Sequence, residues 1–289
     1  ICAGFFIFWC LILKELFKKL FIRVQADDLF IEEAALSYTT ILALVPDITL
    51  VISIFAMVPA FTPIKQALQN FVQNNFMPVF SEAIGDYIGI FIAHAGQMTV
   101  TGTVILFIVS FFLVRAVDKA LNRIWRGGKR KMTMTFAVYW MLLTLGPLAT
   151  GILIWFTSKV IAYFFLYTSL SFATGLAYFL VPVVVELILV SALFITVPVA
   201  VVKIRDAVRG ALFVMVLFEI CKRIFSAFIL NFSDYEAIYG ALAAIPVLMI
   251  WININWVIVL FGAEFTVCLS ELREEKHRIS QQITCSRKN

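Results

Sequence analysis

Charged side chains are scarce in this chain. Asp, Glu, Lys and Arg make up 14% of its 289 residues, whereas a soluble domain has about 25%. Hydrophobic residues account for 62%, and the mean hydropathy is +0.99. This balance excludes an ordinary soluble domain and predicts a polytopic membrane protein.

Residues that build metal centres and disulfides are also few. The chain has two histidines, His94 and His277, far apart in sequence, and an odd number of cysteines, five, with no CxxC pair. Neither a zinc site nor a disulfide framework is indicated. The motifs GxxxxGK[ST], HExxH and GxSxG are absent. We therefore expect no metal, no cofactor and no enzymatic activity.

Apolar residues are gathered in runs that reach the roughly 20 residues needed to cross a bilayer. They predict an all-α, six-span transmembrane bundle within residues 34–271, with spans at about 34–60, 99–121, 134–157, 172–201, 207–231 and 235–271. Residues 61–98 alternate polar and apolar groups at helical spacing, which predicts amphipathic periplasmic helices. Residues 272–289 form a polar cytoplasmic tail.

The first 33 residues are predicted to form an amphipathic interfacial segment. Lys14, Lys18, Lys19 and Arg23 alternate with apolar residues, a pattern that suits a helix lying among anionic headgroups. An ordinary solvated helix is the alternative. Lys and Arg also crowd the connections after the second and fourth spans and the tail. The positive-inside rule then places both termini in the cytoplasm.

Several polar side chains fall inside the predicted spans, where one charge costs about 2.5–3.5 kcal/mol. They must pair or face water, so they are candidates for a polar cavity or ligand site: Asp47, Glu186, Glu219, Lys222, Arg223, Asn253 and Glu264. Asn253 and Glu264 are eleven residues apart, which places them on one helix face. The alternative is that these groups only hydrogen-bond to neighbouring helices.

The fifth span has two cations for one anion. Glu219 has Arg223 at the favourable i, i+4 spacing and Lys222 at i, i+3, so one of the two cations needs another partner: Glu186, Asp47 or a lipid phosphate. Four prolines lie near span centres and are expected to interrupt their helices: Pro46, Pro147, Pro182 and Pro246. Broken helices beside buried charge mark binding sites in many transporters.

Five segments carry a family resemblance: AALSYTTILALVP (34–46), ALNRIWR (120–126), TFAVYWMLLTLGPL (135–148), VPVAVVKIRDAVRGAL (197–212) and YEAIYGALAAIPVLMIW (235–251). With them the chain resembles the YihY/virulence factor BrkB family of bacterial inner-membrane proteins. The resemblance implies six spans and cytoplasmic termini. That family was formerly labelled ribonuclease BN, but it supplies no catalytic residues for this chain. Asp47 departs from the family pattern, which is apolar after the proline.

The expected function is to bind or transport an anionic lipid or another amphiphile of the cell envelope. The basic interfacial segment and the surplus cation of the fifth span motivate this hypothesis. The alternative is a non-catalytic scaffold that holds envelope-assembly partners through residues 61–98, and a ribonuclease comes third. Membrane lipids are therefore the expected partners, and nucleic acid is not.

Overall fold

The structure, a computed structural model, describes residues 14–16, 18–57, 100–128, 138–139, 152, 156, 159, 171–230 and 244–286. All regular secondary structure in these ranges is helical. The predicted helices of residues 61–98, Pro147 and most of the third predicted span lie outside the described residues.

Residues 18–26 form a short helix, called here the N-terminal helix. It is followed by α2 (Leu29–Met57), α5 (Val100–Ile124), α7 (Ser171–Thr196), α8 (Ile204–Leu230) and α10 (Ala244–Ser286). The chain turns between the N-terminal helix and α2 at Asp28, whose φ of 49° is left-handed, a conformation that Asp tolerates better than most residues.

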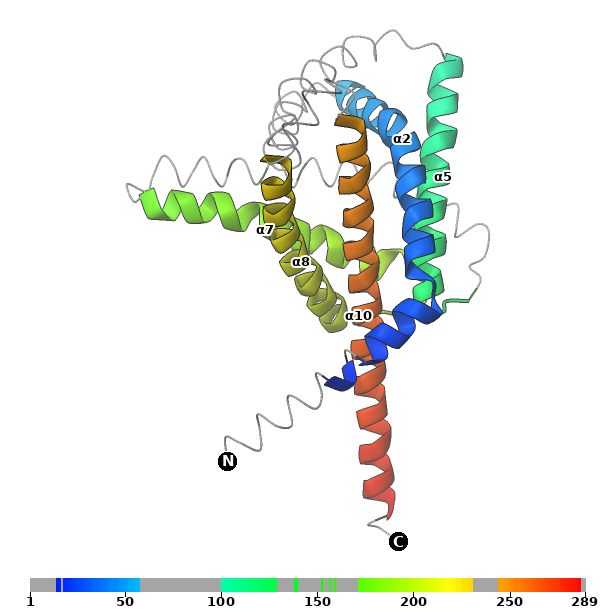
Figure 1. Ribbon diagram of the computed structural model, residues 1–289. Coiled ribbons are helices and arrows are strands. Elements are labelled where there is room, and N and C mark those ends of the chain that lie inside the picture. Colours follow the sequence, from blue (N-terminus) through cyan, green and yellow to red (C-terminus); the bar gives the residue numbers. More distant parts are fainter. Residues whose placement is uncertain are drawn as a thin grey trace.

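α10 is the central helix of the described bundle. It contacts α2, α5 and α8, while α7 contacts α8 and crosses it at a steep angle (Figure 1). The core comprises apolar side chains from the N-terminal helix and the five labelled helices, among them Leu20, Leu36, Leu121, Phe194, Val214 and Leu260. The N-terminal helix therefore belongs to the core through its Leu20 side.

The outer surfaces of these helices carry many large apolar side chains. On α8, every fourth residue is an exposed large apolar side chain, from Ile204 and Val208 through to Ile224 and Phe228. The same spacing occurs on α5 with Val104, Ile108 and Phe112. A helix that is apolar on its outer face as well as its inner face suits surrounding lipid.

By length and composition, fewer helices qualify as membrane-spanning than have apolar outer faces. Among the described residues, one helix, Pro246–Glu275, is long and apolar enough to cross a membrane, and a shorter apolar stretch covers Pro182–Thr196. At 1.5 Å per residue, Pro246–Glu275 extends about 45 Å, which exceeds the hydrocarbon core of a bilayer.

The prolines interrupt the helices less than predicted. α2 continues through Pro46 and α7 through Pro182, so neither residue ends its helix. α2 nevertheless bends along its length (Figure 1). The described part of α10 begins at Ala244 and is helical through Pro246.

Candidate functional site

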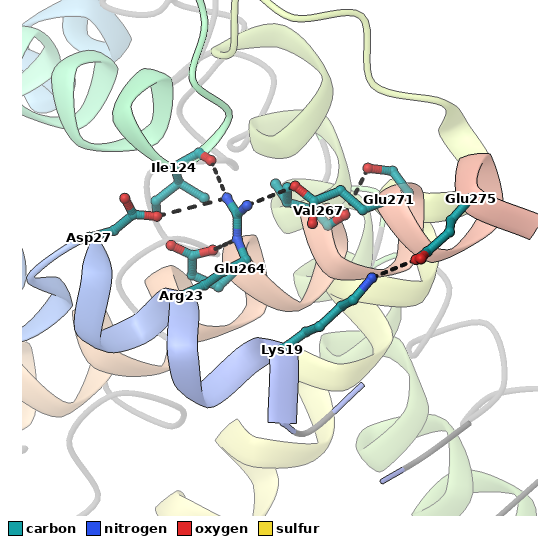
Figure 2. Close-up of polar contacts among 9 residues, drawn as sticks. Lys19, Arg23, Asp27, Ile124, Glu264, Val267, Glu271 and Glu275 are labelled. Atoms are coloured by element: carbon teal, nitrogen blue, oxygen red, sulfur yellow. Dashed lines mark hydrogen bonds and ion pairs between the residues drawn. The ribbon is translucent and has the colours of Figure 1, made fainter. Parts of the chain in front are cut away.

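Arg23 is the centre of a buried polar cluster. Its side chain leaves the N-terminal helix and is 7% exposed. Nε donates to Glu264 Oε2 at 2.7 Å and Nη1 donates to Glu271 Oε1 at 2.8 Å, both on α10. Nη2 donates to the carbonyl oxygen of Ile124 at 2.8 Å, at the end of α5 (Figure 2). One guanidinium thus ties three helices together.

The position of Arg23 corrects the sequence prediction, which placed it among lipid headgroups. Burial lowers the pKa of Arg23, but the hydrogen bond and charge of Glu264, together with the charge of Glu271, raise it overall. The guanidinium therefore stays charged. Lys19, one turn earlier, pairs with Glu275 at 2.7 Å, and this hydrogen bond raises the pKa of Lys19.

The outward face of the N-terminal helix keeps the predicted interfacial character. Lys18 is exposed there together with Phe21 and Ile22. Exposed basic and large apolar side chains on one face match the composition of a helix at a membrane surface. The interfacial role of this face remains a prediction.

Asn253 and Glu264 share a face of α10, as their spacing predicted. Asn253 donates through Nδ2 to Glu33 Oε1 on α2 at 3.1 Å, and Glu264 meets Arg23. Between them, Trp256 donates from Nε1 to Thr40 Oγ1 at 2.8 Å. This face therefore joins α10 to α2 and the N-terminal helix through polar contacts.

A second polar group lies between α7 and α8. Lys222 Nζ is 2.6 Å from Glu219 Oε1, one turn away, and 3.6 Å from Glu186 Oε2 on α7. Two carboxylates thus share one ammonium group. Asn253, a candidate for the same polar site in the sequence, contacts Glu33 on α2 and is not part of this group.

Arg223 does not pair with Glu219 as its spacing predicted. It is exposed, and no hydrogen bond or ion pair of Arg223 occurs within the described ranges. Lys222 takes the inward position on α8, and Arg223 takes the outward one. Asp47 lies in the helical backbone of α2, and its side chain is outside the described part of the chain.

Sequence reasoning missed two contacts that hold the connection between α7 and α8. Asn122 on α5 accepts from the backbone N–H of Val199 at 2.6 Å. Asp206 is 1% exposed and forms an ion pair with Arg273 of α10. The sequence signals for these two contacts were the polar residues of ALNRIWR and of the basic turn after the fourth predicted span. Among the described side chains, no group of His, Cys, Asp and Glu could hold a metal ion.

Helices whose outer faces are apolar and whose interior contains buried ion pairs are typical of a helical membrane protein. The sequence matches the virulence factor BrkB family over residues 20–283. A UPF0761 membrane protein of Alteromonas mediterranea is 39% identical over 279 residues, covering 91% of this chain and 90% of the relative. One from Aeromonas salmonicida is 40% identical over 253 residues, covering 86% and 87%. The chain belongs to the virulence factor BrkB family of membrane proteins. No solved structure matches it.

Proposed function

We propose that this protein spans the bacterial inner membrane six times, with both termini in the cytoplasm, and binds or transports an anionic lipid or a related amphiphile. Membership of a membrane-protein family supports the location. The apolar outer faces of α5, α7 and α8 support several spans. The gathering of Lys and Arg in alternate connections supports the orientation.

The observation that carries the lipid proposal is Arg223. It is exposed on α8 beside Ile220 and Ile224, which is 65% exposed. A guanidinium in contact with lipid tails is costly, so it requires an anionic group. Arg offers a planar set of donors that fits a phosphate in bidentate geometry.

The position of Arg223 along α8 suits a headgroup. α8 begins at Ile204 beside the basic turn, and Arg223 follows by nineteen residues, or about 28 Å at 1.5 Å per residue. The hydrocarbon core is about 30 Å thick. Arg223 therefore lies near the membrane surface opposite the basic turn, within reach of the outer-leaflet phosphates.

Lys222 cannot serve that role as well as Arg223. Its ammonium group is shared by Glu219 and Glu186, so the local charge there is already negative. Of Lys222 and Arg223, Arg223 is the one that makes no ion pair within the described residues, so it is the cation available to a ligand. Glu186 and Glu219 would keep Lys222 turned inward and leave the Arg223 guanidinium free to meet the phosphate.

The test is lipid binding by the purified full chain in detergent. Native mass spectrometry would follow titration with phosphatidylglycerol, with phosphatidylcholine as the zwitterionic control. We expect Arg223→Gln to lose most of the preference for phosphatidylglycerol and Arg223→Lys to keep part of it. Arg209→Gln, which removes an exposed cation at the other end of α8, is the matched control. Equal binding by wild type and Arg223→Gln would contradict the proposal.

A further inference from the structure

The carboxyl groups of Asp27 and Glu264 face one another beside Arg23. Each group has one buried oxygen, Asp27 Oδ2 and Glu264 Oε1, that accepts no hydrogen bond from the described residues. Asp27 and Glu264 lie within hydrogen-bonding reach of each other, and both flank the guanidinium (Figure 2). Ionised carboxylates are acceptors only, so neither of two ionised carboxylates in this position can donate a hydrogen bond to the other.

Glu264 is shielded from bulk water. Its side chain is 0% exposed and that of Asp27 is 14% exposed. Arg23 satisfies Glu264 through Oε2 at 2.7 Å, but its Nη2 lies 3.8 Å from Asp27 Oδ2, too far for a hydrogen bond. A buried acceptor left without a donor costs about 1–3 kcal/mol, and more when it is charged.

The surrounding charges do not balance two ionised carboxylates. The N-terminal helix contributes Lys19 and Arg23 besides Asp27. α5 contributes the Ile124 carbonyl oxygen and Arg123, whose charge also acts on Asp27 but which is paired with Glu32 and Asp28. α10 contributes the Cys268 thiol, Glu271 and Glu275 besides Glu264. α8 also packs on α10, but its Asp206 is paired with Arg273. Apart from Arg123, which Glu32 and Asp28 share, Lys19 and Arg23 face four carboxylates, of which Glu264 is fully buried and Asp27 is 14% exposed.

We propose that Asp27 and Glu264 bind one proton between them, which makes this pair a proton-binding site that links the N-terminal helix to α10. The proton lies between the two facing oxygens, so the protonated group donates and the ionised group accepts. Neighbouring carboxyl groups that cannot both ionise behave in this way. Glu264 Oε2 remains the acceptor for Arg23. Loss of the proton leaves two buried negative charges beside one guanidinium and loosens the N-terminal helix from α10.

Amide substitutions imitate the protonated pair. In Glu264→Gln, the amide oxygen can accept from Arg23 while the amide nitrogen donates to Asp27. Asp27→Asn supplies the donor from the other side. Both variants remove the shared proton while they keep the hydrogen bonds, so we expect both to fold. Glu271→Gln is the matched control, because it removes a half-exposed carboxylate from the same guanidinium.

The test is infrared spectroscopy of the full chain in detergent at neutral pH, where a protonated carboxylic acid absorbs apart from a carboxylate. We expect wild type and Glu271→Gln to show this absorption, and Glu264→Gln and Asp27→Asn to lack it. The thermal stability of wild type should fall as the pH rises, because the native pair holds a proton that the unfolded chain has released. The two amide variants should lack this loss.

Two results would overturn the proposal. The first is a wild-type spectrum without a protonated carboxylic acid, or one whose band survives both amide substitutions. The second is stabilisation of wild type by sodium ions that both amide variants abolish, since a bound cation would then occupy the place of the proton. If Glu264→Gln does not fold, Asp27→Asn and the pH titration of wild type decide the question.

Discussion

At the scale of single residues, Asn122 holds the non-helical connection between α7 and α8. Its side-chain oxygen accepts from Val199 N–H, and its Nδ2 donates to the Asp118 carbonyl oxygen and to Asp118 Oδ1, each at 2.9 Å. The Tyr139 hydroxyl donates to Asp118 Oδ2 at 2.9 Å. Asp118 therefore orients the amide, and the amide satisfies backbone outside any helix.

Replacement of Asn122 by Leu should destabilise the protein. Leu has a similar size but leaves the Val199 N–H without its acceptor, which costs about 1–3 kcal/mol. Thermal unfolding in detergent would measure the loss. Thr39→Val is the control, because the Thr39 hydroxyl only donates to Ala35 O of its own helix. Equal melting temperatures for Asn122→Leu and Thr39→Val would refute this role.

The Asp206–Arg273 ion pair allows a second prediction at this scale. Removal of one partner of a buried ion pair costs about 3–5 kcal/mol because the other charge stays buried. Arg273→Gln should therefore lower the melting temperature strongly, although the N-terminus of α8 stabilises Asp206 in part. Adding Asp206→Asn should recover most of the loss. A double variant as unstable as Arg273→Gln would show that the pair is not the cause.

The sequence predicted which residues carry charge in the spans but not their partners. Lys222 and Arg223 are both within one turn of Glu219, at i+3 and i+4, so spacing alone allows either pair. The rotation of α8 relative to α7 decides which cation pairs with Glu219, because it places Lys222 next to Glu186 of α7. Likewise, the sequence predicted that Arg23 is an interfacial cation, but the packing of α10 places Glu264 beside it. Such pairing depends on tertiary contacts that a single sequence does not contain.

At the scale of helices, two glycines determine how closely α8 and α10 pack against each other. A Cβ atom added at Gly262 would lie 1.9 Å from Val214 Cγ2, and one added at Gly210 would lie 1.7 Å from Thr266 Oγ1. Each glycine thus faces a side chain of the other helix. Small residues allow this close packing between membrane helices, where the backbones approach each other.

Gly262→Ala should weaken this crossing. Ala favours a helix over Gly by about 1 kcal/mol, but the clash with Val214 adds an overpacking cost of about 1–3 kcal/mol. We expect a lower melting temperature, and recovery when Val214→Ala restores the space. Gly128→Ala is the control, since nothing lies within 4 Å of its added Cβ. A Gly262→Ala variant as stable as wild type would show that the helices do not pack this closely.

Helix positions were the most predictable feature of the fold. The spans predicted at 34–60, 99–121 and 207–231 agree with α2, α5 and α8 to within a few residues, because long apolar runs determine them. The end of α10 was not predicted. The helix continues fifteen residues past Glu271, through a stretch assigned to a polar tail. Polarity ends a membrane span, but Glu, Lys, Arg and Gln are good helix formers.

At the scale of the whole molecule, the sequence prediction that this chain is not a ribonuclease can be tested directly. We expect purified, nuclease-free protein to leave RNA intact with and without divalent metal ions, measured by gel electrophoresis. Cleavage that persists through purification and disappears on a point mutation of this chain would contradict the prediction.

The proposed orientation places the basic end of the bundle in the cytoplasm. Arg23 of the N-terminal helix bonds to Glu264 of α10 and to Ile124 at the end of α5, and Asp206 near the start of α8 pairs with Arg273 of α10. The N-terminal helix and the start of α8 lie toward the same end of the bundle, and α10 projects beyond it (Figure 1). α10 is about 64 Å long at 1.5 Å per residue, roughly twice the hydrocarbon thickness. In the proposed orientation, its polar final third extends into the cytoplasm.

This arrangement makes the topology testable. Reporter fusions at Lys129 and Lys276 should be cytoplasmic, because both follow spans at the basic end of the bundle. Fusions at Gln73 and Ser233 should be periplasmic, because their connections are poor in Lys and Arg. Paired alkaline phosphatase and fluorescent-protein fusions at each site would measure this, and each site would control for expression of the others. A cytoplasmic Gln73 would remove the first pair of spans. It would also place both ends of α2 and α5 on one side, which their apolar outer faces do not support.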